Sequence, residues 1–211
     1  MSGYLSYRSK VWQNTSRAGL PKSFLEDMDF EKYADFVIKM PLLFVVRNSK
    51  LIEAEGKNFE DFMQGKVSAI KNTKPHILDF KNHLATIFTE VRLKKYIEIR
   101  SIDTCEWDCH CGGPAFYAGL LYGNLNEAFD IINKWKTSDV LNAYADAPKK
   151  GLSTVLNNKT LLEWGKIFLN LSKKGLEKRA IKNDSEKDES IFLRTVEIIL
   201  VQNKTKGDII I

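Results

Sequence analysis

The stretch that decides the fold is Lys94–Phe116, KKYIEIRSIDTCEWDCHCGGPAF. Its first part alternates, with Glu98 and Arg100 on one side and Ile97 and Ile99 on the other. This period of two is typical of a β-strand, and we expect its apolar side to face the core. The carboxylate and the guanidinium would lie roughly 7 Å apart on one face. They could be a surface ion pair of little energetic value, but a carboxylate suits Mg²⁺ and an arginine suits phosphate. The pattern therefore also favours magnesium–nucleotide chemistry.

The cysteines follow this strand directly. Cys105, Cys109 and Cys111 have the spacing C-x3-C-x-C, with His110 between the last two. Structural zinc sites usually take four ligands from two separated knuckles, often C-x2-C, and the other two histidines are distant in the sequence. Zinc is thus the weaker alternative. We expect three free thiols in a loop that leads from a strand into a helix.

The composition is that of an ordinary globular chain. Its 211 residues are 44% hydrophobic and 28% charged, and no apolar run reaches the ~20 residues of a membrane span. The N-terminus shows no secretory signal, and an odd number of cysteines argues against a secreted disulfide framework. We therefore expect a cytoplasmic protein. The net charge of +5 is spread over stretches that also carry acids, which predicts a solvated surface and neither a nucleic-acid nor a membrane partner.

The coarse pattern changes along the chain. Apolar residues at helical spacing over Phe30–Val37, with Asp29 as N-cap, predict a helix, and PLLFVVR then reads as a buried strand. Strands dominate 1–104 and amphipathic helices dominate 114–203. This order predicts an α+β fold, because alternating βαβ units are missing.

Four other residues are candidates for a site. Arg8, in SYRSKVW, and Arg17, in the SRAGLP loop, are unremarkable when each is taken alone. His83 is more readily a structural helix histidine than a catalyst. Trp107 could anchor a core or form the wall of a pocket, and the sequence does not separate these two roles.

Several longer segments together carry a family resemblance. In order and spacing, SYRSKVWQNT, RAGLP, PLLFVVR, NHLATIFTEVRLKKYIEIRSID and PAFYAGLLYG resemble the C-terminal half of the plant and proteobacterial type of glutamate–cysteine ligase. The resemblance covers Gly3 to Gln202. It implies a glutamine-synthetase-like fold, in which a curved antiparallel sheet has helices outside it. It also implies the first step of glutathione biosynthesis: ATP phosphorylates the γ-carboxylate of L-glutamate, the amine of L-cysteine attacks the acyl phosphate, and Mg²⁺ neutralises the phosphates.

The resemblance also implies roles for single residues. Glu98 matches a glutamate that resembles a metal ligand, and Arg100 matches an arginine expected at the ATP phosphates or the acyl phosphate. Arg8 matches an arginine expected to hold substrate glutamate. Arg17 matches a substrate-side arginine of less defined role, and Trp107 matches a tryptophan that would form a wall of the amino-acid pocket.

Departures from the family pattern limit what can be carried over. Of the three cysteines, Cys111 alone matches a family position, and Leu43 and Thr89 stand where the family usually has an aromatic residue and a proline. The family's N-terminal half, with most of its acidic Mg²⁺ ligands, lies outside this sequence. We therefore expect 1–211 to be the C-terminal portion of a catalytic domain, inactive alone and completed in cis or in trans. The alternatives are a related ligase with another amine substrate and a non-catalytic module that kept the fold.

Overall fold

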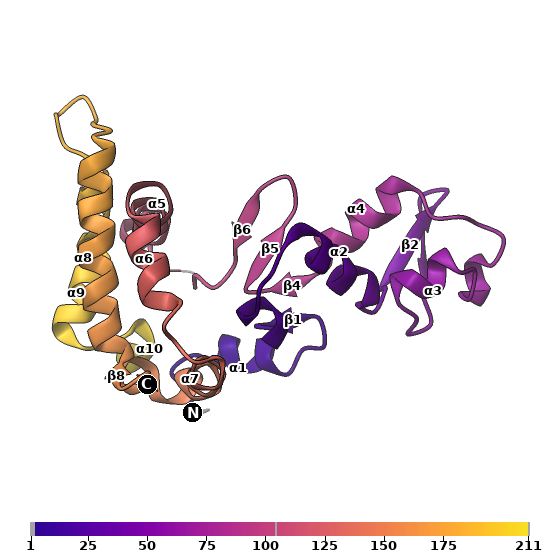
Figure 1. Ribbon diagram of the computed structural model, residues 1–211, viewed down its shortest axis with the longest axis horizontal. Coiled ribbons are helices and arrows are strands. Elements are labelled where there is room, and N and C mark those ends of the chain that lie inside the picture. Colours follow the sequence, from indigo (N-terminus) through magenta and orange to yellow (C-terminus); the bar gives the residue numbers. More distant parts are fainter. Residues whose placement is uncertain (1–2, 104, 211) are drawn as a thin grey trace. The chain divides into compact units, whose positions relative to one another are not determined.

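The chain forms two units in a computed structural model that describes residues 3–103 and 105–210. The inner unit is Val11–Ser101, and the terminal unit joins Met1–Lys10 to Ile102–Ile211. Helix α1 (Tyr7–Gln13) begins in the terminal unit and ends in the inner one. The colours of Figure 1 separate the two units, because the inner unit runs from indigo to magenta and most of the terminal unit is pink to yellow.

The inner unit combines short strands with short helices. Its helices are α2 (Phe30–Lys39), α3 (Phe59–Met63) and α4 (Ile77–Ala85), with 3-10 turns η1 (Lys22–Leu25) and η2 (Ser68–Ile70). Its strands are β1 (Ala18–Gly19), β2 (Phe44–Arg47), β3 (Lys50–Glu53), β4 (Phe88–Thr89), β5 (Val91–Leu93) and β6 (Ile97–Ile99). They pair two by two, β1 with β4 in parallel and the other two pairs as antiparallel hairpins.

Helix α2 begins where the sequence predicts it. The Asp29 side chain accepts a hydrogen bond from the Lys32 backbone N–H at 2.8 Å, which satisfies one of the orphan donors of the first turn. The apolar stripe of the helix buries Tyr33 and Val37 against Ile87. The predicted helix and its N-cap are thus confirmed, and α2 fixes the segment that precedes β5.

The β2–β3 hairpin has a two-residue turn. Asn48 and Ser49 both have positive φ, 50° and 61°. Two such residues form a turn whose twist matches the right-handed twist of the flanking strands. The hairpin buries Val45 in a second core cluster with Phe59 and Phe62. A separate ion pair, Arg47–Asp79, joins the end of β2 to α4.

The β5–β6 hairpin corrects the expected orientation of its faces. Ile97 is 66% exposed, whereas Arg92, from the polar side of the hairpin, is 6% exposed. Among the described residues, β6 pairs with β5 alone, so it is not an interior strand. The polar side is the more buried one because the carbonyls of Ala85, at the end of α4, and Ile87, just before β4, accept hydrogen bonds from the Arg92 guanidinium.

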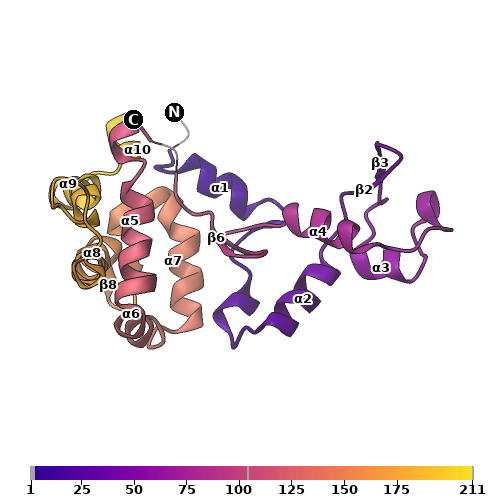
Figure 2. The ribbon, with the colours of Figure 1, turned by 90° about the horizontal axis from the view of Figure 1, so that it is seen from above.

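The terminal unit is mainly helical. Its elements are the 3-10 turns η3 (Trp107–Cys109), η5 (Gly151–Ser153) and η6 (Glu189–Leu193), the π-helix η4 (Gly119–Gly123), helices α5 (Gly112–Ala118), α6 (Leu125–Ile132), α7 (Thr137–Lys150), α8 (Leu161–Arg179), α9 (Arg194–Gln202) and α10 (Lys206–Ile210), and strands β7 (Val155–Leu156) and β8 (Lys159–Thr160). Helix α8 lies alongside α5 and α9 (Figures 1 and 2). The N-terminal residues join this unit, since the Ser6 backbone N–H donates to the Pro148 carbonyl at 3.0 Å.

Close backbone contact fixes η4 against α8. A Cβ atom on Gly175 would overlap the carbonyl oxygen of Gly119, and one on Gly119 would overlap that of Ser172. Next to this contact, Trp164 and Phe168 of α8 pack in the main core cluster of the unit. The approach therefore depends on the absence of side chains at these two glycines.

The architecture confirms the predicted α+β class, with helices as the main component and small, mostly antiparallel sheets. The expectation of three free thiols is wrong, because Cys105 and Cys109 form a disulfide and Cys111 alone is free. A turn brings their Cα atoms to 6.0 Å, within the range that a disulfide needs. No helix in the described part of the chain is long and apolar enough to cross a membrane.

Candidate functional site

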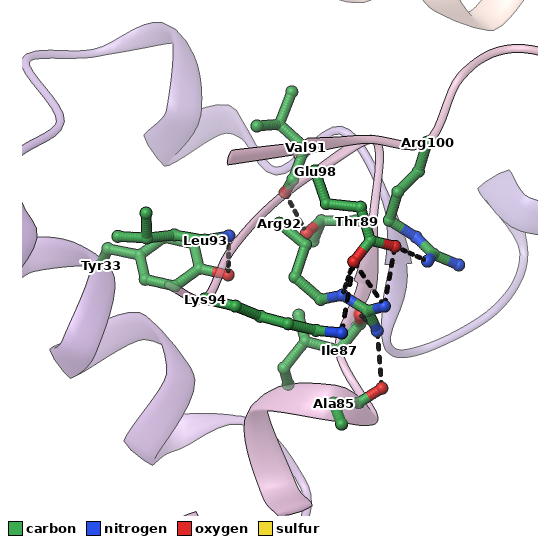
Figure 3. A network of polar contacts seen from close by, with 10 residues as sticks. All are labelled: Tyr33, Ala85, Ile87, Thr89, Val91, Arg92, Leu93, Lys94, Glu98 and Arg100. Carbon is green, nitrogen blue, oxygen red and sulfur yellow. Dashed lines mark hydrogen bonds and ion pairs between the residues drawn. The ribbon is translucent and has the colours of Figure 1, made fainter. Parts of the chain in front are cut away.

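A carboxylate surrounded by cations occupies the polar side of the β5–β6 hairpin. The hairpin register places Arg92 directly opposite Glu98, and Arg100 follows Glu98 by two residues on the same side. Lys94 reaches the same carboxylate from the end of the hairpin. Figure 3 shows the three cationic side chains converging on Glu98, and we call these four residues the Glu98 cluster.

Each cation contacts the Glu98 carboxylate directly. Arg92 Nη2 lies 2.8 Å from both oxygens, and Arg92 Nε lies 3.2 Å from Oε2. Arg100 Nη1 lies 2.6 Å from Oε1, and Lys94 Nζ lies 3.3 Å from Oε2. Burial alone would raise the pKa of Glu98, but the hydrogen bonds from Arg92 and Arg100 outweigh it and lower that pKa to about 2. Glu98 is therefore an anion at any physiological pH.

The cluster has an excess of positive charge, since three cations meet one carboxylate. Arg92 is the fixed member, because its Nη1 also donates to the carbonyls of Ala85 at 2.5 Å and Ile87 at 3.0 Å. Arg100 and Lys94 are more open, with 22% and 29% of their side chains exposed. An arginine has five N–H donors and a lysine three, so both can bind a further anion while they contact Glu98.

The cluster can supply one carboxylate ligand to a divalent cation, but it does not form a complete metal site. In residues 3–103 and 105–210, no group of three or more His, Cys, Asp or Glu side chains could hold a metal ion. Mg²⁺, however, is commonly bound through one or two carboxylates together with substrate phosphates and waters. Glu98, an ionised carboxylate that is 24% exposed, is the group of the cluster that could serve as such a ligand.

Arg17 lies in the same unit but has a different environment. The residue is 4% exposed, and its Nε donates to the Thr86 carbonyl at 3.0 Å while Nη2 donates to the Thr86 hydroxyl. Burial lowers the pKa of the Arg17 guanidinium. Its own carbonyl accepts from the N–H of Phe88, whose ring lies 5.5 Å from the Arg100 guanidinium carbon. Arg17 therefore supports the β4 segment beneath Arg100.

The other two predicted substrate residues lie in the terminal unit. Arg8 Nη1 lies 3.2 Å from Asp103 Oδ1, and both side chains are partly exposed. Trp107 is 87% exposed, so its possible role as a core anchor is excluded. Its ring centroid lies 6.0 Å from that of His110. Arg8 and Trp107 thus belong to a different unit from the Glu98 cluster.

One member of the Glu98 cluster could not be picked out from the sequence. Lys94 belongs to the cluster through its contact with Glu98. In the sequence nothing distinguishes Lys94 from the neighbouring Lys95.

His83 is buried on α4, where its Nε2 lies 2.8 Å from the Val37 carbonyl and its ring stacks on Phe59. This placement agrees with the structural role preferred for His83.

Comparison with known proteins finds related sequences over most of the chain. A family model described as glutamate-cysteine ligase family 2 (GCS2) matches residues 1–209. The chain is 37% identical to glutamate–cysteine ligase A of rice (Oryza sativa subsp. indica) over 98% of its length, and 39% identical to the tomato enzyme over 86%. The Arabidopsis thaliana enzyme is 34% identical over 98% of the chain. These alignments cover 42%, 36% and 40% of the respective relatives, so the chain spans about two fifths of their length.

The same relatives overturn one expectation. All three are named as chloroplastic enzymes, so the prediction of a cytoplasmic protein is wrong. That prediction rested on the start of the sequence and on the odd number of cysteines. Neither observation distinguishes a plastid from the cytoplasm, because both reasons concern only secretion.

Proposed function

Because the chain belongs to the glutamate–cysteine ligase family, we propose that it forms the phosphate-binding portion of an ATP-dependent ligase that joins L-glutamate to L-cysteine. The product is γ-glutamylcysteine, the first intermediate of glutathione biosynthesis. The observation that carries the proposal is the positive excess of the Glu98 cluster, where three cations meet one carboxylate. Residues outside this chain are proposed to complete the catalytic domain.

Within the cluster, Arg100 and Lys94 bind the phosphates of ATP and neutralise the charge that develops as the γ-phosphoryl group moves to the γ-carboxylate of glutamate. Such stabilisation by preorganised charges is the main contribution that a protein makes to phosphoryl transfer. Glu98 is the carboxylate that would hold Mg²⁺, which supplies further neutralisation of the phosphates. Arg92 acts through Glu98 as a positioning residue, since its guanidinium is fixed by the backbone carbonyls of Ala85 and Ile87.

The remaining predicted residues have substrate-side roles in this proposal. Arg8 binds a carboxylate of glutamate through its guanidinium, which is partly exposed and also contacts Asp103. Trp107 offers an exposed ring as part of the amino-acid pocket. Arg17 contributes indirectly, through the β4 segment below Arg100.

The test measures binding of the magnesium complex of a non-hydrolysable ATP analogue by isothermal titration calorimetry. Lys94→Met and Lys95→Met are matched variants that remove the same charge from neighbouring positions. Only Lys94 contacts Glu98, whereas Lys95 is exposed. We expect Arg100→Met to weaken binding by about 10- to 100-fold and Lys94→Met by about tenfold, while Lys95→Met stays within about twofold of the parent chain.

Equal losses for Lys94→Met and Lys95→Met would mean that only general charge matters, and the site would be rejected. An unchanged affinity for Arg100→Met would reject it as well. A second titration with Mg²⁺ alone tests the metal role. We expect Mg²⁺ to bind Glu98 measurably only when the nucleotide is present, because three cations oppose a lone divalent ion.

A further inference from the structure

The terminal unit contains a cavity of about 450 Å³ beside the Arg8–Asp103 ion pair. Its walls come from the N-terminal residues around Ser6, the segment after Ser101, the end of α7 and helices α9 and α10. This volume lies within the range of about 300–1,000 Å³ that is usual for small-molecule sites. The Glu98 cluster contributes no residue to the cavity.

The lining of the cavity is mostly apolar, with one charge of each sign. Among the described lining residues, Asp103 and Lys206 are the charged ones. Four hydroxyl side chains add hydrogen-bonding groups, and the remainder are aliphatic side chains, small residues and the disulfide-bonded Cys105 and Cys109. The aliphatic residues include Leu5, Ile102, Leu152, Val196 and Ile199.

Both charged residues can take a further partner. Asp103 contacts Arg8 through Oδ1 at 3.2 Å, and Lys206 Nζ lies 3.5 Å from Glu106 Oε2, on a side chain that is 85% exposed. A carboxylate has about four lone-pair positions, and a lysine ammonium has three donors and no acceptor. An ammonium group can therefore bind Asp103, and a carboxylate can bind Lys206, without loss of the outer ion pairs.

We propose that this cavity binds a small α-amino acid with an aliphatic side chain. Asp103 pairs with its ammonium group, Lys206 pairs with its carboxylate, and the aliphatic walls bury its side chain. One carboxylate and one ammonium in an apolar lining are complementary to a zwitterion. A glutamate ligand would instead bring a second carboxylate into a lining that offers a single lysine, so the site disfavours acidic amino acids.

The test uses L-norvaline, which has no thiol and so cannot exchange with the disulfide. Two analogues remove one charge each, pentanoate without the ammonium and n-butylamine without the carboxylate. Binding to the full chain is measured by protein-observed NMR titration without nucleotide. We expect norvaline to bind at least about tenfold more tightly than either analogue or L-glutamate, and to shift resonances of the cavity lining.

Variants then assign the charges. Asp103→Asn and Lys206→Gln alter side chains that are 55% and 46% exposed, so the fold is retained. Each is expected to weaken norvaline about tenfold or more. Asp146→Asn is the matched control, because Asp146 lies on α7 beside the cavity residue Ala147 but pairs outside it with Lys150.

Equal binding of pentanoate and norvaline, no saturable binding of norvaline, or an equal effect of the Asp146 control would overturn the proposal. These outcomes are independent of the proposed function. They involve neither the nucleotide analogue nor any residue of the inner unit, so the cavity could fail while the Glu98 cluster binds nucleotide, or the reverse.

Discussion

Arg92 and Glu98 stand directly opposite each other in the β5–β6 hairpin, and Arg92 Nη2 lies 2.8 Å from both carboxylate oxygens. The two partners differ in exposure, with 7% of the Arg92 side chain and 24% of the Glu98 side chain accessible. The buried arginine is held by carbonyls, so it positions the more open carboxylate. Because the buried Arg92 is fixed, the carboxylate of Glu98 is held in one orientation while it remains accessible to solvent.

The first prediction concerns this pair. Arg92→Lys keeps the charge but removes the two-pronged contact and at least one bond to the Ala85 or Ile87 carbonyl. We expect a loss of ~2 kcal/mol in the free energy of unfolding of the inner unit, because partially buried charges lose their partners. Urea unfolding followed by hydrogen exchange of inner-unit amides measures it. Arg194→Lys, on α9, is the control; a comparable loss there would contradict a specific role for Arg92.

His83 makes the stability of the inner unit dependent on pH. Burial lowers the pKa of His83 from 6.5 to about 4, with a further lowering by the Arg17 charge. Between these values the unfolded chain binds a proton that the folded chain does not, so stability falls as pH decreases from 6.5 to 4. The full effect is about 3 kcal/mol. Above pH 6.5 His83 has no such effect.

NMR titration of the three histidine rings provides the measurement. The His83 ring should keep neutral-form chemical shifts down to about pH 5. Protonation of His83 near its ordinary pKa of 6.5 would show that the ring is not buried as described.

Asp79 joins β2 to α4. Its carboxylate accepts from Arg47 Nη1 at 2.7 Å and Nη2 at 2.8 Å, and from the His76 backbone N–H at 2.7 Å. Burial alone would raise the pKa of Asp79, but the Arg47 hydrogen bonds outweigh it and lower the pKa. Asp79→Ala should cost about 2–3 kcal/mol of unfolding free energy, since it removes a helix cap and leaves Arg47 unpaired. The exposed Asp35→Ala should change stability by less than about 0.5 kcal/mol, and equal effects would refute the assignment.

The glycine contact between η4 and α8 gives a prediction for the terminal unit. Gly175→Ala would place its Cβ against the Gly119 carbonyl, so the helices must separate, at a cost of about 2–3 kcal/mol. Lys174→Ala changes the neighbouring exposed position and should be close to neutral. Thermal unfolding and hydrogen exchange of α8 amides measure both. A neutral Gly175→Ala would mean that the helices are not in close contact.

Part of this architecture could be predicted from local sequence. The N-cap at Asp29 and the spacing of α2 are short-range signals, and the alternation around Glu98 correctly put Glu98 and Arg100 on one side of a strand. Alternation distinguishes two sides of a strand but does not say which is buried. That depended on the carbonyls of Ala85 and Ile87, whose proximity to Arg92 is set by how the chain turns between α4 and β5.

Other features depended on geometry that residue spacing does not contain. Lys94 and Lys95 are equivalent in sequence, and only the end of the hairpin decides which one reaches Glu98. The Cys105–Cys109 disulfide follows from a turn that brings their Cα atoms to 6.0 Å, whereas the count of cysteines suggested free thiols. The cavity beside Asp103 combines segments as far apart in the sequence as Leu5 and Gly207, so no motif could reveal it.

The discontinuity of the terminal unit has a consequence for the order of folding during synthesis. The hydrogen bond from Ser6 to Pro148 cannot form until the ribosome has released α7. The inner unit is continuous in sequence and leaves the ribosome earlier, so it can fold while the first ten residues still lack their partners. The emergence of α7 from the ribosome therefore sets the earliest time at which this part of the terminal unit can close.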